Sequence, residues 1–296
     1  MCPPIQPSMP NIFDFSPTAL AQLAYDDVTR ALQEDVGAGD LTASLIPADR
    51  ISHACVLARE SAVVCGSAWV QAAVLRLDPT AQFTWRVQDG QHCVENQVVF
   101  EVRGSARALL TAERTALNFL QLLSGVATKT AQYVDIVRGT RAHIVDTRKT
   151  LPGLRLAQKY AVRCGGGTNH RVGLYDAILI KENHIAAAGG IPQVMAQAAY
   201  LTAQADFVEI EVETLAQLRE ALICGAKMVL LDNMDLPTLH EAVRINAERA
   251  ILEISGGVTL DRLRALAETG VDRISIGTLT KDVRATDYSM RLTSTS

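Results

Sequence analysis

The stretch AHIVDTRKTLPG, residues 142–153, decides the fold of this chain. Its first part is a short apolar run typical of a buried strand, and polar residues take over at Asp146. Two adjacent cations, Arg148 and Lys149, follow the strand end, and Pro152-Gly153 then turns the chain. A strand that ends in cations before a tight turn predicts a rigid corner that binds anions.

The same order, an apolar run followed by a helix-length stretch, repeats through the second half of the chain. The runs are short and rich in Ile, Val and Leu, like strands that are buried in a parallel sheet. They indicate βα units, which build either an open doubly wound sheet or a barrel. Polar residues at the ends of nearly all the runs favour a barrel with its site on that face. The predicted strands are 142–146, 177–181, 207–212, 228–232, 251–255 and 273–277.

The first half of the chain follows a different pattern. Pro at the first helical position and a terminal Gly delimit one helix, and β-rich runs with an Asp-Gly turn come next. The predictions are a helix from Ser16-Pro17 to Gly37, β structure from about His53 to Val102 with a turn at Asp89-Gly90, and a helix from about Ala106 to Val137 that is interrupted near Gly125.

Composition limits the classes of protein to consider. The chain has 296 residues, 48% of them apolar, enough for one large domain or two modest ones. A net charge of −4 argues against general nucleic-acid binding. No apolar run reaches the roughly 18 residues of a membrane span, and the N-terminus lacks the features of a signal peptide. The six cysteines form no C-x-x-C pair, which argues against a zinc site and fits a reducing cytoplasm.

Cations gather in one segment of this acidic chain. Residues 148–181 hold seven Lys or Arg against one acid, Asp176. Such a segment predicts a small, strongly anionic ligand. Arginine suits carboxylates and lysine suits phosphate. The cations at strand ends or in the glycine-rich loop 165–171 are the candidate ligand-binding residues, whereas a solvated helix face is the interpretation for Arg155, Lys159 and Arg163.

Carboxylates and glycines mark the later strand ends. Glu209, Glu211 and Glu213 alternate along one strand face; on an edge strand they would be solvated, but in a βα repeat they need cationic or metal partners. Asp232 and Glu253 interrupt or end other strands, and the group could hold ribose hydroxyls or magnesium. Glycine turns at Ser255-Gly256-Gly257 and Ile276-Gly277-Thr278 predict a phosphate cradle. A further polar stripe, equally compatible with a solvent face, comprises Arg114, Asn118 and Gln121.

Five motifs follow one another along the chain: EDVGAGDLT (34–42), ERTALN (113–118), DTRKT (146–150), GGGTNHR (165–171) and KENH (181–184). Together they resemble the motifs of quinolinate phosphoribosyltransferases. The resemblance runs from about residue 17 to residue 291, and Thr278 departs from it because alanine is common there.

The resemblance implies a pentosyltransferase of NAD biosynthesis, which makes nicotinate mononucleotide, pyrophosphate and carbon dioxide from quinolinate and phosphoribosyl pyrophosphate. It implies an α/β fold with an N-terminal α/β sandwich domain, residues 1–124 plus 281–296, and an incomplete α/β barrel of about seven strands, residues 125–280. It also implies magnesium as cofactor and a homodimer or higher homo-oligomer with shared active sites.

The resemblance also assigns roles to residues by motif. Catalysis would involve Lys149, Glu211 and Asp232, and magnesium would bind Glu211 and Asp232. Quinolinate would bind Thr147, Arg148, His170, Arg171, Lys181 and, from the neighbouring subunit, Arg114. Phosphoribosyl pyrophosphate would bind Lys149, Lys181, Glu211, Asp232, Ser255, Gly256, Gly257, Ile276, Gly277 and Thr278.

Two other functions fit the same residues. One is a Schiff-base aldolase that uses Lys149 or Lys181 as nucleophile, which needs a desolvated lysine of lowered pKa. The other is a phosphosugar-binding protein without catalytic activity. Borohydride trapping would identify the first, and ligand binding without turnover would identify the second.

Overall fold

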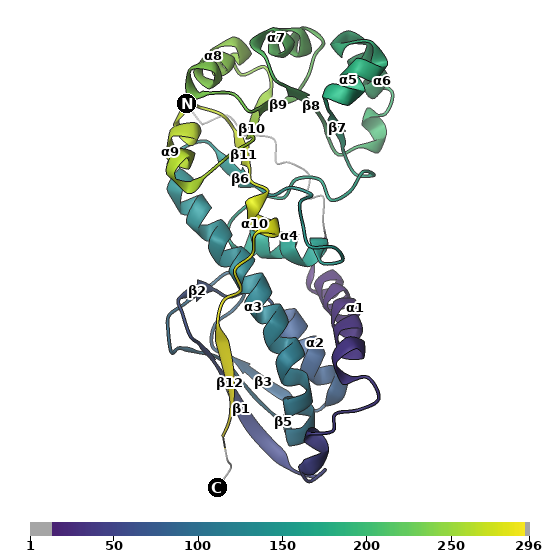
Figure 1. Cartoon of the computed structure of the whole chain (residues 1–296), viewed down its shortest axis with the longest axis vertical. Helices are drawn as coiled ribbons and strands as arrows, with labels where there is room; N and C mark the ends of the chain where they lie inside the picture. The colour runs from purple at the N-terminus through teal and green to yellow at the C-terminus, as the bar shows by residue number, and fades with distance from the viewer. Residues whose placement is uncertain (1–13, 294–296) are drawn as a thin grey trace. The chain divides into compact units, whose positions relative to one another are not determined.

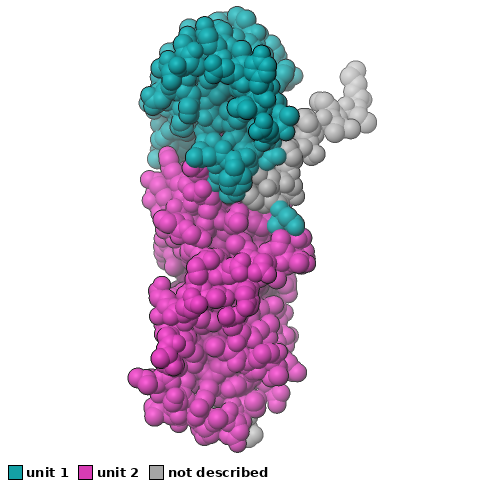
Figure 2. Space-filling view, turned by 90° about the vertical axis from the view of Figure 1, so that its right-hand side faces the viewer, with its two compact units in different colours: residues 1–14, 140–142, 171–275 teal, residues 15–139, 143–170, 276–296 magenta. Residues whose placement is uncertain are grey.

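The structure, a computed structural model, describes residues 14–293 and divides into two compact units (Figure 2). The described part of unit 1 comprises residues 14, 140–142 and 171–275, and that of unit 2 comprises residues 15–139, 143–170 and 276–293. Cys2 and the N-terminal segment in which no signal peptide is expected lie outside the described residues. Across residues 14–293, no helix combines the length and the apolar character that crossing a membrane would need.

Unit 2 is built on a four-stranded antiparallel sheet in the order β12-β1-β5-β3. The last strand of the chain therefore pairs with the first, and Figure 1 shows the yellow β12 beside β1. The predicted β structure and the turn at Asp89-Gly90 are both present. The strands of unit 2 are β1 (Ile51–Ala58), β2 (Ala62–Val63), β3 (Gln82–Trp85), β4 (His92–Cys93), β5 (Val98–Ser105), β6 (His143–Val145) and β12 (Tyr288–Thr293).

The helices of unit 2 confirm one prediction and correct another. The predicted helix start at Ser16 is confirmed, because its hydroxyl accepts a hydrogen bond from the Ala19 amide at 3.4 Å. The helix α2 was not predicted, although Trp69, Val70 and Ala73 recur at helical spacing and are fully buried. The helices are α1 (Pro17–Val36), η1 (Ala43–Leu45), α2 (Ser67–Leu77), α3 (Ala106–Val137), α4 (Arg155–Cys164) and α10 (Thr278–Lys281).

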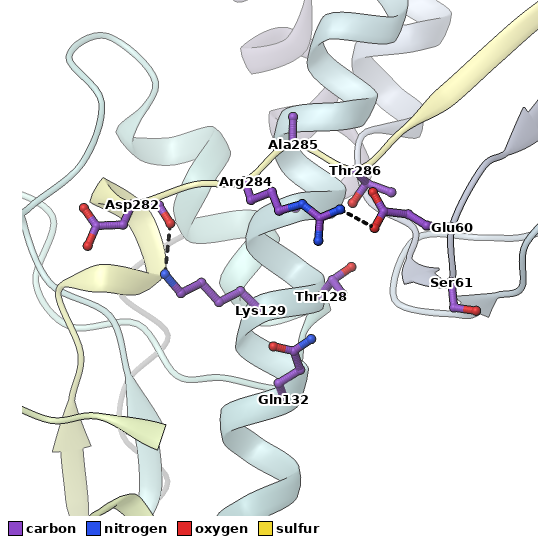
Figure 3. Close-up of a pocket in the computed structure, with 10 residues that line it drawn as sticks. Glu60, Ser61, Thr128, Lys129, Gln132, Asp282, Arg284, Ala285 and Thr286 are labelled. Carbon is purple, nitrogen blue, oxygen red and sulfur yellow. Dashed lines mark hydrogen bonds and ion pairs between the residues drawn. The ribbon is translucent and has the colours of Figure 1, made fainter. Parts of the chain in front are cut away.

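The interruption predicted near Gly125 is wrong, because α3 is continuous through it. A Cβ at Gly125 would lie 2.3 Å from the carbonyl oxygen of Arg284, so the glycine makes room for the returning chain. This segment lines a polar cavity of about 240 Å³, and Figure 3 shows Lys129 of α3 bonded to Asp282 and Arg284 bonded to Glu60. The segment that contains Arg284 thus passes close to α3 just before β12 begins.

Unit 1 contains a parallel sheet in the order β7-β8-β9-β10-β11. In Figure 1 the helices α7, α8 and α9 lie on the outer side of these strands. The strands are β7 (Ile178–Ile180), β8 (Val208–Val212), β9 (Met228–Asp232), β10 (Ile251–Ser255) and β11 (Arg273–Ser275). The helices are α5 (Glu182–Ala188), α6 (Ile191–Ala199), η2 (Thr202–Gln204), α7 (Leu215–Ile223), α8 (Leu236–Asn246) and α9 (Leu260–Glu268).

The register of this sheet separates apolar from charged side chains. Residues paired between parallel strands share a face, and alternate residues of one strand share it too. One face therefore carries apolar residues such as Ile210, Leu231 and Ile254, all buried. The other face, called here the charged face, carries Glu209, Glu211, Asp232, Glu253, Ser255 and Arg273.

The α/β class is confirmed, as are all six predicted strands of the second half, each to within two residues at either end. Between residues 140 and 280 the structure assigns six strands, whereas the resemblance implies about seven. The strands of unit 1 are all parallel, as the repeated βα pattern predicts.

Substitution of Gly125 tests whether the close approach limits stability. We expect Gly125→Ala to lower the free energy of unfolding of unit 2 by about 1–2 kcal/mol, because the clash with a backbone carbonyl outweighs the better helix propensity of alanine. Both tryptophans, Trp69 and Trp85, lie in unit 2, so urea unfolding followed by tryptophan fluorescence reports on this unit. Gln132→Ala, at an exposed position of α3, is the control, and equal losses in the two variants would contradict the steric argument.

Candidate active site

The carboxyl ends of β7, β8 and β9 bring one cation and two carboxylates to the charged face. Lys181 directly follows β7, and its Nζ donates to Glu211 Oε2 at 3.0 Å. Asp232 ends β9 on the same face. The Lys181 side chain is 46% exposed and that of Glu211 only 10%, so the ammonium can reach a ligand while it stays paired.

Glu211 lies under opposing influences. Burial raises the pKa of Glu211 above its usual value. The hydrogen bond and the charge of Lys181 lower this pKa, while the negative charges of Asp232 and Glu182 raise it. Asp232 is therefore close enough to repel Glu211, and two such carboxylates gain from positive charge placed between them. Their hard oxygen atoms are ligands that magnesium prefers, so the pair fits this ion.

Deeper on the charged face, buried charged side chains are bonded to other protein groups. Glu253 is fully buried and accepts from Arg273 Nε at 2.7 Å. Arg273 was not singled out from the sequence, although its place at the start of a strand opposite Glu253 was an available signal. Arg171 is buried and donates to the carbonyl of Ala177 at 3.2 Å. These charges are held by protein groups that the fold supplies.

The stripe of three carboxylates predicted on β8 divides by depth. Glu209 is fully buried, Glu211 is half-buried at the strand end, and Glu213 lies exposed beyond the strand. Only Glu211 combines a place at the carboxyl end with partial access to solvent. It is thus the one residue of this stripe that both meets a protein cation in the structure and can meet a small ligand.

The turn after β10 contains two glycines in left-handed conformations. Gly256 has φ +93°, and a Cβ there would lie 3.2 Å from the amide nitrogen of Asn233. Gly257 has φ +56°, with nothing within 4 Å of a Cβ. The turn therefore packs against the end of β9 and faces open space at Gly257, as a backbone site for an anion requires. Ser255 precedes it, half-buried and paired in register with Asp232.

In unit 2 the predicted cationic corner meets the second glycine turn. A Cβ at Gly277 would lie 2.7 Å from Cδ of Lys149, so the glycine makes room for this side chain. The Thr147 hydroxyl accepts from the Lys149 amide at 3.1 Å. The Nε of Arg148 and the hydroxyl of Thr278 are buried without a hydrogen-bond partner. Lys149 is exposed, and Ile276, which precedes the glycine, is buried.

The solvated face predicted for α4 is wrong at its middle residue. Arg163 is exposed and Arg155 half-buried, but Lys159 is fully buried beside the equally buried Asp146. His170 is also buried, with its backbone amide bonded to Asp146 at 2.8 Å. The reason is that the loop 165–170 folds back over α4, a contact that the periodicity of one helix cannot reveal.

The polar stripe on α3 is present but borders a separate cavity. Arg114 and Asn118 are exposed and Gln121 is half-buried. Asn118 lines a cavity of about 200 Å³ together with Glu34 and Asp35, so two of the five motifs meet there. Arg114 is in none of the salt bridges found among residues 14–293.

Comparison with known proteins agrees with this architecture. Residues 40–124 match the model of the N-terminal domain of quinolinate phosphoribosyl transferase, and residues 126–291 match that of the C-terminal domain. The chain is 41% identical over 260 residues to a probable nicotinate-nucleotide pyrophosphorylase [carboxylating] of Bacillus subtilis, covering 88% of this chain and 90% of that protein. It is 43% identical over 279 residues to the nicotinate-nucleotide pyrophosphorylase [carboxylating] of Mycobacterium leprae, covering 91% and 97%.

A solved structure extends the likeness to three dimensions. The nicotinate-nucleotide pyrophosphorylase of Francisella tularensis superposes with a TM-score of 0.89 at 43% identity, and the match covers 92% of this chain and 97% of that one. Family models that span both parts of the chain, close relatives along nearly its full length and a shared fold lead to one conclusion. The chain belongs to the quinolinate phosphoribosyltransferase family.

Proposed function

We propose that this protein transfers the phosphoribosyl group of phosphoribosyl pyrophosphate to quinolinate and removes one carboxylate, giving nicotinate mononucleotide, pyrophosphate and carbon dioxide. The observation that carries the proposal is the Lys181–Glu211 ion pair beside Asp232 at the strand ends of the charged face. In this arrangement Lys181 can bind an acidic substrate, and Glu211 and Asp232 can face a positive charge that develops during the reaction. Family membership supplies the reaction that uses both.

Quinolinate, a pyridine with two carboxylates, is the ligand for the cations. Arg148 offers a buried Nε without a partner, which suits one carboxylate oxygen. Thr147, His170, Arg171 and Lys181 complete the binding residues of the same subunit. Arg114, exposed on α3, is assigned to the site of the neighbouring subunit in a homodimer or higher homo-oligomer.

Phosphoribosyl pyrophosphate takes the remaining assignments. Glu211 and Asp232 hold the ribose hydroxyls, and Lys149 and Lys181 bind the anionic groups. The open turn at Gly257 supports the assignment of a phosphate to the glycine turns. The cradle comprises Ser255, Gly256, Gly257, Ile276, Gly277 and Thr278.

Catalysis in this proposal depends on charge compensation. The bond between the anomeric carbon and pyrophosphate breaks, and the sugar gains positive charge, which Glu211 and Asp232 stabilise because they are held in place before the reaction. The quinolinate ring nitrogen donates its electron pair to the anomeric carbon. The bond to the 2-carboxylate then breaks, its electrons pass to the pyridinium ring, and a proton replaces the carbon dioxide. Magnesium, held by Glu211 and Asp232, would neutralise charge on the pyrophosphate.

The Schiff-base alternative finds no support in the surroundings of the lysines. The Nζ of Lys181 donates to Glu211 at 3.0 Å, and Lys149 is exposed. A nucleophilic lysine needs a neutral amine, which desolvation would favour and a carboxylate partner opposes. We also infer a cytoplasmic location, since the five cysteines of the described residues are all free thiols.

Product analysis tests the proposed reaction. With quinolinate, phosphoribosyl pyrophosphate and magnesium, we expect nicotinate mononucleotide and carbon dioxide in equal amounts, and activity should fall when a chelator removes magnesium. Nicotinate should be a poor substrate, because its missing carboxylate leaves a cation unpaired at a cost of about 1–3 kcal/mol per group. That cost corresponds to a loss of about tenfold to a hundredfold in kcat/KM. Equal kcat/KM values for the two acids would refute the assignment of the cations.

Mixed oligomers test the role of Arg114. Arg114→Ala and Arg148→Ala should each be inactive alone. If Arg114 serves the neighbouring subunit, random reassociation gives about half mixed dimers, each with one intact site, so activity returns to roughly a quarter of wild type. The measurement is activity after co-expression, with mixed dimers verified by mass. A mixture that stays inactive would place Arg114 in its own subunit's site or outside it.

Titration of Glu211 tests the electrostatics of the charged face. Lys181→Met removes a cation and should raise the pKa of Glu211 further, whereas Asp232→Asn removes a like charge and should lower it. Ionised Glu211 would then persist to lower pH in Asp232→Asn and be lost at higher pH in Lys181→Met. Carbon-13 NMR of labelled glutamate carboxyls, assigned with Glu211→Gln, measures both shifts. If both substitutions moved the pKa of Glu211 in the same direction, the charges of Lys181 and Asp232 would not act on Glu211 as described.

A further inference from the structure

Lys159 is a lysine with no access to solvent. Its side chain and that of Asp146 are both 0% exposed, and Nζ lies 2.5 Å from Asp146 Oδ1. Neither residue is among those assigned to a substrate above. A buried charge pair of this kind is unusual, because each ion loses its hydration when the chain folds.

The pair is bonded to the segment that ends in His170. Lys159 Nζ donates to the His170 carbonyl at 2.8 Å, and the His170 amide donates to Asp146 Oδ1 at 2.8 Å. Asn169 Nδ2 donates to Asp146 Oδ2 at 2.8 Å and to the Lys159 carbonyl at 2.9 Å. Both backbone groups of His170 and the side chain before it are therefore fixed by these two residues.

The segment before His170 is held first by α4, because the amides of its three glycines donate to the carbonyls of Ala161, Arg163 and Val162 at 2.9–3.0 Å. These glycines, Gly165-Gly166-Gly167, have no side chain that could fix the residues after them. Thr168, the next residue, is held at the end of strand β6. Its amide donates to the Ile144 carbonyl at 2.8 Å, and the amide of Asp146 donates to the Thr168 carbonyl at 3.1 Å. Beyond Thr168, Asn169 and His170 are bonded to Asp146 and Lys159.

A buried ion pair is by itself weak evidence of a stabilising role. Replacing a buried ion pair by apolar residues of similar volume is often neutral or stabilising, whereas removing one partner strands the other charge. The pair can instead orient the groups around it, because a carboxylate accepts and an ammonium donates several hydrogen bonds. Here the group that it orients is the backbone of His170.

We propose that Lys159 is a positioning residue for the substrate acid: with Asp146 it sets the backbone of Asn169 and His170, and so the place of the His170 ring. The inference rests on the proposed function in taking quinolinate as the ligand near His170. Lys159 touches no substrate and acts only through the loop. Its loss should therefore weaken quinolinate binding and leave phosphoribosyl pyrophosphate binding largely unchanged.

The first test compares two cations of the helix α4, the buried Lys159 and the exposed Arg163. Lys159→Met keeps the volume of the side chain and removes its charge and donors, and Arg163→Met removes an exposed cation one turn later as the matched control. We expect the KM for quinolinate to rise about tenfold to a hundredfold in Lys159→Met, the range for loss of a group that orients a ligand-binding residue. The KM for phosphoribosyl pyrophosphate should change by less than about threefold, and Arg163→Met should resemble wild type.

A double variant separates positioning from stability. Lys159→Met with Asp146→Asn leaves no stranded charge, so its Tm should recover relative to Lys159→Met alone. Positioning predicts that the KM for quinolinate stays high, because the donor to the His170 carbonyl is still missing. Recovery of KM together with Tm would overturn the inference. If Lys159→Met does not fold, the double variant carries this test by itself.

A spectroscopic measurement makes the inference independent of turnover. The chain has six histidines, so nitrogen-15 labelled histidine gives few signals, and His170→Gln assigns the one needed. We expect the His170 amide and ring signals to shift in Lys159→Met and in the double variant but not in Arg163→Met. Unchanged signals would overturn the positioning role, whereas a wild-type protein that makes no nicotinate mononucleotide would overturn only the proposed function.

Discussion

The register of the parallel strands is the constraint on which the rest of unit 1 depends. Pairing Glu211 with Leu230, Leu230 with Glu253 and Glu253 with Arg273 puts every charged side chain of these rows on one face. A slip of one residue in any strand would turn its charges into the apolar layer against the helices. The penalty for burying unpaired charge therefore enforces the same register that gathers the functional groups.

Some cations of this chain are paired with carboxylates and others are not. In unit 1, Lys181 and Arg273 each have a carboxylate partner within 3.0 Å. In unit 2, Arg148 keeps a buried Nε without a partner and Lys149 is exposed. Paired cations hold a fixed geometry, and unpaired ones provide the attraction for an anion. An overall charge of −4 conceals this local excess, which is why the segment from 148 to 181 was informative when the total was not.

Features that depend on residues close together along the chain could be predicted from the sequence. Strand positions followed from short Ile, Val and Leu runs, and the start of α1 followed from Ser16-Pro17. The helix α2 was missed because its alanine-rich sequence lies between strand-forming runs. Gly125 suggested a break because the Arg284 carbonyl that it accommodates is 159 residues away along the chain. Lys159 misled for the same reason: helical spacing groups it with exposed cations, but the loop that covers it is a tertiary contact.

The pairing of β12 with β1 has a consequence for synthesis of the protein. Ala58 emerges from the ribosome about 230 residues before its partner Tyr288, an interval of roughly 10 to 50 seconds at typical translation rates. Throughout that interval one edge of β1 has no strand to cover it, and exposed edges invite pairing with other chains. The nascent chain must therefore be shielded, or its early sheet kept loose, until the final strand arrives.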